Sequence, residues 1–189
     1  NYIMSKTAVI LAGGKGSRLK PYTISIPKPL VPIGDTPILE LIINRLKHFG
    51  YNKIIITVNH LADVIKAYFG DGKKWGVNIE YSYEEKPLST MGPIKMLKNL
   101  PEDFLVMNGD VLTDIDFKLF FDQHKINNKI FTIAAQKRNE KIDYGVLEKD
   151  TGNNLIGFTE TPTYSFLVSM GIYYLKRETL EFIPENEFF

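Results

Sequence analysis

Two short stretches of the sequence hold residue types that could bind a phosphorylated ligand. The first is the glycine-rich stretch 13–19, which reads GGKGSRL. Glycine lets successive backbone N–H groups lie close around a phosphate, because it has no side chain and accepts positive φ. Lys15, Arg18 and the later Lys28 add positive charge, and an arginine can bond two phosphate oxygens at once. From these residues alone, the stretch is either a phosphate loop or an ordinary turn.

Two common phosphate-binding fingerprints do not fit this stretch. A P-loop needs four residues between its first glycine and a Gly-Lys-Ser/Thr group, and the sequence has no such string. The dinucleotide-binding fingerprint needs a third glycine at the position that Leu19 occupies. The sequence therefore predicts a phosphate loop of another type, or a plain turn.

The second stretch is Asn108-Gly109-Asp110, which follows a short apolar run. A carboxylate opposite a phosphate loop suits Mg²⁺, which binds one or two protein oxygens and completes its shell with substrate phosphates. An aspartate that caps a turn is the common alternative explanation of Asp110. Asp114 and Asp116 lie nearby, and Asp116 just precedes a helical pattern, which favours an N-cap over a metal ligand.

Other residues with possible chemistry favour structural roles. The three histidines lack metal-binding spacing, and we find no Ser/His/Asp elbow motif; the histidines are His48, His60 and His124. An aromatic group could stack on a base, but packing in the core or on the sheet is the favoured explanation. That group consists of Trp75, Tyr81 and Tyr83.

Apolar runs place both phosphate-binding stretches directly after buried strands. Residues 6–12 read KTAVILA, and residues 103–107 form the run before Asn108. Further strands are predicted at 53–58, 77–83 and 130–136, and helices at 37–49, 61–69, 91–98 and 116–127. Ligands of open parallel sheets bind beyond the carboxyl ends of the strands, so we expect both stretches at that edge.

The first helix has clear predicted boundaries. Thr36 suits its N-cap, Pro37 its first helical position and Gly50 its C-terminal stop. The preceding stretch 13–36 has no helical period, so it predicts a long ordered loop, which in compact domains usually serves a function.

Strands that alternate with helices predict right-handed βαβ crossovers and a mostly parallel sheet. After Asp143 the pattern changes to short strands, expected at 145–148, 155–159 and 168–174. No linker separates these strands from the rest. The predicted fold is therefore α/β and Rossmann-like: a mostly parallel mixed sheet flanked by helices, with a β-rich C-terminal elaboration, in a single domain over residues 1–189.

The composition excludes several classes of protein. Lys and Arg number 23 against 22 Asp and Glu, and a net charge of +1 gives no overall field for gripping nucleic acid or an anionic membrane. The chain has no cysteine, which excludes disulfides and thiol nucleophiles. We see no membrane-span run and no signal peptide, so the cytoplasm is the expected compartment. We expect residues 1–5 to be a tag remnant or linker, and the C-terminal portion of the domain to be missing.

The string LAGGKGSRLKPYTISIPKPLVPIG, residues 11–34, closely resembles the N-terminal signature of the sugar-1-phosphate nucleotidyltransferases, the NDP-sugar pyrophosphorylases. The resemblance covers nearly the whole chain in order, and its nearest branch is the mannose-1-phosphate guanylyltransferase-like one. The further matching segments are ILE at 38–40, YFGDG at 68–72, residues 84–93, NGD at 108–110, YGVLE at 144–148 and GIY at 171–173.

The resemblance implies transfer of a nucleoside monophosphate from an NTP to a sugar 1-phosphate, with release of pyrophosphate and with Mg²⁺ as cofactor. Arg18 would hold the triphosphate, Lys28 would bridge the α-phosphate and the sugar phosphate, and Asp110 would bind Mg²⁺. The implied nucleotide-binding residues are Leu11, Ala12, Gly13, Gly14, Gly16, Ser17, Pro87, Leu88 and Gly92. The implied sugar-phosphate residues are Gly145, Glu160, Thr161 and Ser169.

The chain departs from the family pattern at several positions. Where the family usually has Glu-Lys-Pro, this chain has Glu160-Thr161-Pro162, and a threonine brings no charge to the sugar phosphate. Ser169 stands where the family often has asparagine, and residues 87–92 read PLSTMG in place of PLGTAG. The family's second metal-binding aspartate has no counterpart after Asp150. A second hypothesis therefore stays open: a nucleotide-binding regulatory homologue with weak or no turnover.

Overall fold

The computed structural model describes residues 6–14, 26–59, 61–84 and 91–184. Its central feature is a six-stranded sheet in the order β5-β4-β1-β6-β10-β7. The strands are β5 (Asn78–Tyr83), β4 (Tyr51–Val58), β1 (Lys6–Leu11), β6 (Asp103–Asn108), β10 (Thr163–Lys176) and β7 (Phe131–Lys141). The first four are parallel to one another, and β10 runs antiparallel to β6. The predicted α/β fold with a mostly parallel sheet is confirmed.

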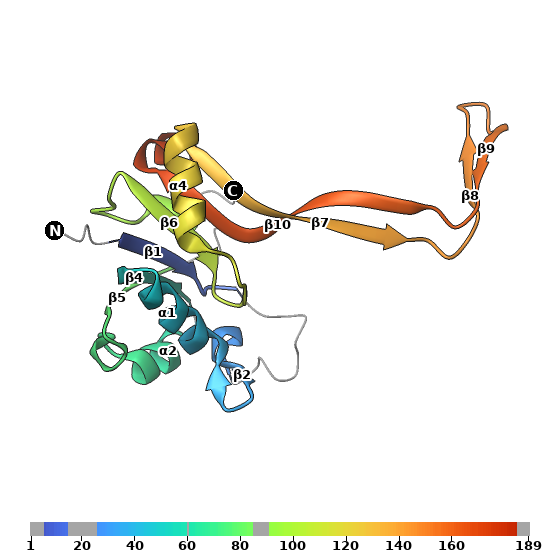
Figure 1. The fold of residues 1–189 in the computed structure, drawn as a ribbon. Helices are drawn as coiled ribbons and strands as arrows, with labels where there is room; N and C mark the ends of the chain where they lie inside the picture. The colour runs from blue at the N-terminus through green and yellow to red at the C-terminus, as the bar shows by residue number, and fades with distance from the viewer. Residues whose placement is uncertain (1–5, 15–25, 60, 85–90, 185–189) are drawn as a thin grey trace. The chain divides into compact units, whose positions relative to one another are not determined.

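By their contacts, the residues form two compact units: Asn1–Ile133 with Gly171–Phe189, and Ala134–Met170. The first unit holds the parallel strands and the helices. These helices are α1 (Ile38–His48), α2 (Ala62–Phe69), α3 (Gly92–Lys95) and α4 (Phe117–Asn127), with short 3-10 turns η3 (Lys28–Leu30), η4 (Lys73–Trp75) and η5 (Arg177–Phe182). Figure 1 shows α1 and α2 together near β4 and β5. No helix among the described residues is long and apolar enough to span a membrane.

The core of the first unit forms because the parallel strands bury side chains on both faces. One apolar cluster joins residues of β1, β4, β6 and β10 to residues around α3; its members are Val9, Ile55, Ile94, Leu100, Phe104, Val106 and Leu175. On α1 the buried side chains recur at helical spacing, at Leu39, Ile42, Ile43 and Leu46. Phe117, the first residue of α4, lies against Tyr51 of β4 with ring centroids 6.1 Å apart.

The boundaries of α1 differ from the prediction at one end. Pro37 is the N-cap, and Thr36 pairs in the two-residue strand β3 (Thr36–Pro37) with β2 (Pro32–Ile33). The N–H of Ile38 donates to the carbonyl of Val31 at 3.1 Å, so a backbone group provides the cap that we expected from the Thr36 hydroxyl. At the other end, Gly50 has φ +85°, a left-handed conformation that ends the helix as predicted.

The boundaries of two other helices, α4 and α3, agree only partly with the prediction. Asp116 caps α4 as predicted, because its carboxylate accepts from the N–H groups of Lys118 and Leu119 at 2.8 and 2.9 Å. The helix expected at 91–98 is the short α3, and the chain then turns through Asn99, whose φ is +58°. The predicted 91–98 helix is therefore wrong in its second half.

The second unit, Ala134–Met170, is built from β-strands alone. Its hairpin pairs β8 (Val146–Lys149) with β9 (Leu155–Thr159), so that Leu147 faces Phe158. The N–H of Ile142 donates to the carbonyl of Pro162 at 2.9 Å and closes the base of this hairpin. The strands β7 and β10 continue into this unit and are longer than the predicted 130–136 and 168–174. The predicted β-rich elaboration corresponds mainly to this unit.

Candidate active site

The ends of β1 and β6 bring the two predicted phosphate-binding stretches to the same edge of the sheet. These neighbouring strands are parallel, and Leu11 lies opposite Asn108 in their register. The N–H of Gly109 donates to the carbonyl of Leu11 at 2.9 Å, which ties the two strand ends together. Gly13 and Asp110 therefore leave the sheet on adjacent strands, as we expected from strand-end placement.

Gly109 is a glycine because of close packing at this edge. A Cβ atom added to it would lie 3.1 Å from the carbonyl oxygen of Leu11 and 3.4 Å from Cγ of Pro29. A side chain here would crowd the backbone of β1 and contact the proline ring. The segment that carries Asp110 is thus pressed against both β1 and the stretch that carries Lys28.

Lys28 and Asp110, two of the three predicted catalytic residues, form an ion pair between Nζ and Oδ2. Pro27 and Pro29 on either side of Lys28 are buried, and the carbonyl of Pro27 accepts from Leu30 at 2.8 Å within the turn η3. The lysine side chain is 35% exposed and the aspartate side chain 26%. Both charged groups are therefore anchored at their backbones and reachable by a ligand.

Two residues that the sequence reasoning missed lie beside Gly13. Asn59 follows β4, and its side-chain amide donates to the carbonyl of Gly13. Glu84 follows β5, and a Cβ atom on Gly13 would overlap its carboxylate. The N–H of Glu84 donates to the carbonyl of Val58 at 2.9 Å, which fixes its backbone. Both residues directly follow strands, so extending the strand-end rule to every strand of the sheet would have found them.

Four adjacent parallel strands thus contribute polar groups to one edge, in the order Glu84, Asn59, Gly13 and Asp110, with Lys28 paired to the last. Carboxylates stand at the two sides, glycine backbone and an amide lie between them, and Lys28 pairs with the carboxylate of Asp110. Such a set can hold a phosphate by backbone N–H groups and lysine, and a cation by a carboxylate.

A family model described as nucleotidyl transferase matches residues 7–187. The chain belongs to this family. The D-glycero-alpha-D-manno-heptose 1-phosphate guanylyltransferase of Campylobacter jejuni is 38% identical, covering 90% of this chain and 76% of the relative. The UTP–glucose-1-phosphate uridylyltransferase of Synechocystis is 33% identical, covering 95% of this chain and 51% of the relative. The resemblance expected from the motif string is thereby confirmed.

The fold of this nucleotidyl transferase chain also matches a solved structure. HddC from Yersinia pseudotuberculosis, crystallised in complex with GMP-PN, superposes with a TM-score of 0.72 at 27% identity. The match covers 97% of this chain and 82% of the HddC chain. Several curated relatives are longer, and the nucleotidyl transferase chain spans about half of their length.

The remaining predicted nucleotide-binding residues are only partly described. Leu11 ends β1, Ala12 is buried with its N–H donated to Thr57 at 3.0 Å, and Gly14 is exposed with open space around it. Gly92 is the buried first residue of α3. The other expected residues, Gly16, Ser17, Arg18, Pro87 and Leu88, lie outside the described residues.

The residues expected at the sugar phosphate all lie in the second unit of the nucleotidyl transferase chain. Gly145 precedes β8 and Glu160 follows β9, and a Cβ atom on Gly145 would lie 3.5 Å from Oε2 of Glu160. Thr161 has φ +41°, a left-handed conformation that is rare for a β-branched residue. Ser169 is exposed on β10. The hairpin therefore brings Gly145 and Glu160 together, which the sequence alone did not state.

Two groups set aside in the sequence are structural. His124 is fully buried, with Nδ1 2.7 Å from the Thr132 hydroxyl and Nε2 3.2 Å from Asp103. Burial lowers the pKa of His124, and the neighbouring Asp103 carboxylate opposes this shift. Trp75 is buried against the ring of Phe69, with centroids 4.9 Å apart. The described residues hold no group of three or more His, Cys, Asp or Glu side chains suited to a metal.

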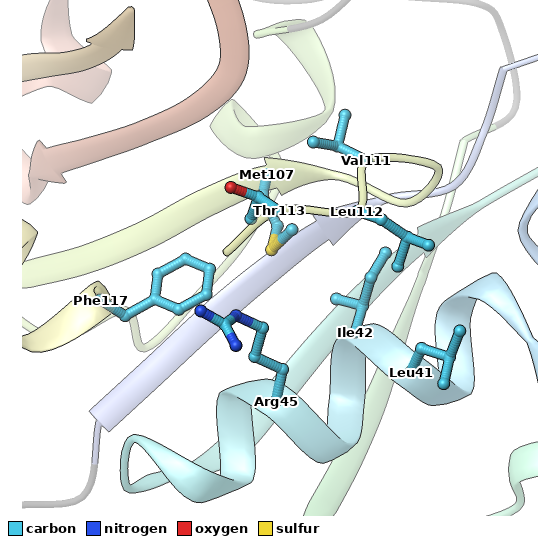
Figure 2. Close-up of a pocket in the computed structure, with 8 residues that line it drawn as sticks. All are labelled: Leu41, Ile42, Arg45, Met107, Val111, Leu112, Thr113 and Phe117. Atoms are coloured by element: carbon cyan, nitrogen blue, oxygen red, sulfur yellow. The ribbon is translucent and has the colours of Figure 1, made fainter. Parts of the chain in front are cut away.

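A small hollow of about 20 Å³ lies next to the segment that follows Asp110. Figure 2 shows the Arg45 guanidinium reaching from α1 toward Phe117, with aliphatic side chains around it. One guanidinium nitrogen of Arg45 donates to the carbonyl of Ile115 at 2.8 Å, while its buried Nε has no hydrogen-bond partner among the described residues. Arg45 thus ties the segment after Asp110 to α1.

Proposed function

We propose that the protein transfers a nucleoside monophosphate from an NTP to a sugar 1-phosphate and releases pyrophosphate. The observation that carries this proposal is the ion pair of Lys28 with Asp110 at the edge where Gly13 leaves the sheet. A cationic group, a carboxylate and glycine backbone at one strand edge are the groups that a phosphate chain with a bound cation requires. Membership of the nucleotidyl transferase family supports the reaction class.

The reaction is an exchange of bonds at the α-phosphorus of the NTP. An oxygen of the sugar phosphate forms a bond to that phosphorus, and the bond from the phosphorus to the oxygen that bridges to the β-phosphorus breaks. The electron pair of the broken bond leaves with pyrophosphate. Two anionic phosphates must approach each other, so the main task of the protein is to hold them in line and to neutralise their charge.

Lys28 and Asp110 divide this task by charge. Without a ligand each neutralises the other. With the substrates bound, the Lys28 ammonium would turn to the α-phosphate and the sugar phosphate, which it would draw together. The Asp110 carboxylate would then hold Mg²⁺, which supplies positive charge to the phosphate oxygens. The site fits this ion, because Mg²⁺ typically takes one or two protein carboxylates and completes its shell with phosphates and water.

GTP is the nucleotide that we propose as the preferred donor. The Campylobacter relative is named as a guanylyltransferase and the Synechocystis relative as a uridylyltransferase. These names alone do not decide between guanine and uracil. Glu84 supports guanine, because its carboxylate beside Gly13 accepts hydrogen bonds and cannot donate them. Guanine presents two adjacent donors, N1–H and N2–H₂, on its Watson–Crick edge. Uracil presents one donor between two acceptors.

For the acceptor we propose a sugar 1-phosphate of the manno type, which is the sugar named for the Campylobacter relative. Gly145 and Glu160 would contact sugar hydroxyls, and Thr161 and Ser169 would contact the phosphate through hydroxyl groups. Because Thr161 has no charge, we expect a weaker hold on the sugar phosphate than a lysine would give. The cytoplasm remains our prediction for the compartment.

The test uses the full-length protein with Mg²⁺, each of the four common NTPs and a panel of sugar 1-phosphates, with pyrophosphate release as the readout. We expect release with GTP and a manno-configured sugar 1-phosphate, lost on removal of Mg²⁺ with a chelator. Asp110→Asn should lose this activity, while Asp114→Asn, an exposed aspartate in the same segment, should keep it. Nucleotide binding without release for any pair would instead favour a regulatory homologue.

A further inference from the structure

The ring of Phe158 lies where a side chain at position 145 would stand. A Cβ atom added to Gly145 would be 2.6 Å from both Cε2 and Cζ of that ring, far inside van der Waals contact. Phe158 belongs to β9 and Gly145 precedes β8, so the hairpin brings the ring onto the glycine backbone. Phe158 is 60% exposed, so burial in a core does not explain its position.

The glycine at 145 is required by this contact and not by its own backbone. Positive-φ glycines occur elsewhere in the described chain, for example Gly171 at φ +70°, but Gly145 is not one of them. Any L-residue could therefore adopt its backbone conformation. What excludes a side chain is the aromatic ring of Phe158.

The carboxylate of Glu160 lies near the same side of Gly145 as the ring. Oε2 of Glu160 is 3.5 Å from the position that a Cβ of Gly145 would occupy. The hydrogen bond from Ile142 N–H to the Pro162 carbonyl, 2.9 Å, closes the base of the hairpin around these residues. Thr161, left-handed at φ +41°, makes the turn that follows Glu160. A carboxylate at this place can accept hydrogen bonds from sugar hydroxyls.

We propose that Phe158 is a positioning residue for the sugar 1-phosphate: its ring packs against Gly145 next to the Glu160 carboxylate and keeps these two residues of the hairpin in place. This inference rests on the proposed function. Phe158 acts through Gly145, so its loss should change the affinity for the sugar 1-phosphate and leave the affinity for the NTP unchanged. A general loss of folding would change both.

The test compares KM for the sugar 1-phosphate and KM for the NTP in four variants of the full-length protein. Gly145→Ala forces a methyl group into the ring, and we expect KM for the sugar 1-phosphate to rise by about tenfold or more. Phe158→Ala should raise the same KM less. The double variant should be no worse than Phe158→Ala, because removing the ring makes room for the methyl group.

Phe166→Ala is the matched control, because Phe166 is a half-exposed aromatic residue of the same unit on β10. It should leave both KM values unchanged. Hydrogen exchange of residues 142–162, measured without substrate, adds a readout independent of turnover. Exchange there should accelerate in Gly145→Ala and return to the Phe158→Ala level in the double variant.

The outcomes separate the two proposals. A wild-type protein that releases no pyrophosphate with any pair overturns the proposed function, and exchange then still decides whether the ring excludes a side chain at 145. A wild-type protein that turns over while Gly145→Ala keeps its KM overturns the role of Phe158 alone. Additive effects of the two substitutions in the double variant also overturn it.

Discussion

Lys28 and Asp110 form an ion pair at the carboxyl edge of the parallel sheet, although they are distant in sequence. The pair exists because Gly109 packs against both Leu11 and Pro29, which brings the segment after β6 onto the turn η3. Both side chains keep part of their surface in solvent. Lys28 and Asp110, the two groups that would bind a triphosphate and its cation, therefore already lie side by side and neutralise each other.

Loss of either charge should lower the rate of nucleotidyl transfer much more than it lowers stability. For Lys28→Met and for Asp110→Asn we expect kcat to fall by roughly 100- to 1,000-fold, as for removal of one preorganised electrostatic group. The pair is partly exposed, so the free energy of unfolding should change little. Pyrophosphate release and thermal unfolding of the same samples check both statements. A Lys28→Met variant with wild-type kcat would contradict the assigned role.

Gly109→Ala should destabilise the protein. Its Cβ atom would lie 3.1 Å from a backbone oxygen and 3.2 Å from Cγ2 of Ile10, which cannot move aside without disturbing β1. We expect the free energy of unfolding to fall by about 1–3 kcal/mol, measured by urea denaturation. Gly14→Ala is the control, because no atom of the described part of the chain lies within 4 Å of its added Cβ. Equal stability of the two variants would show that the packing at Gly109 is loose.

Glu84→Gln should change the choice of base. The glutamine amide keeps one acceptor and gains a donor, so it matches the edge of uracil better and that of guanine worse. We expect kcat/KM for GTP to fall about 10- to 100-fold while that for UTP is unchanged or rises. Glu80→Gln serves as the control. Glu80 lies on β5, the strand that Glu84 follows, and forms an ion pair with Lys53 of β4. If kcat/KM falls equally for GTP and for UTP, Glu84 does not determine the choice of base.

His124 should make stability fall at acid pH. Burial lowers the pKa of His124 in the folded protein below its usual value near 6.5, although Asp103 opposes this, and Lys125 and Lys176 add to the lowering. Between the two pKa values, His124 is therefore protonated in the unfolded chain and neutral in the folded protein. The stabilisation is complete above about pH 6.5 and is lost as the pH falls toward the folded pKa, by at most about 1.4 kcal/mol per pH unit.

Urea denaturation at a series of pH values from about 7 to about 5 measures this effect. His124→Gln should lose the part of the pH dependence that comes from this group, although it should be less stable at every pH. Parallel curves for the wild type and His124→Gln would contradict the prediction.

Local sequence patterns sufficed for most elements and for part of the site. The apolar runs predicted β1 and β6, and strand-end placement brought Gly13 and Asp110 to one edge, as observed. Asp116 was identified as a cap because side-chain capping involves residues two or three positions apart. These features depend on neighbours in the chain, so the order of residues is enough to predict them.

Other features depend on which strands lie next to each other, and no local pattern contains that information. The pairing of Lys28 with Asp110, the placement of Glu84 and Asn59 beside Gly13, and the ring of Phe158 on Gly145 all join residues from different elements. The Thr36 cap is replaced for the same reason, because the carbonyl of Val31 lies next to the N–H of Ile38 in the folded chain. Residue types and periodicity predict the secondary structure of a segment and the chemical groups that it carries. Strand order and close packing determine which groups meet, because contact energies act between atoms that are near in space and not between neighbours along the chain.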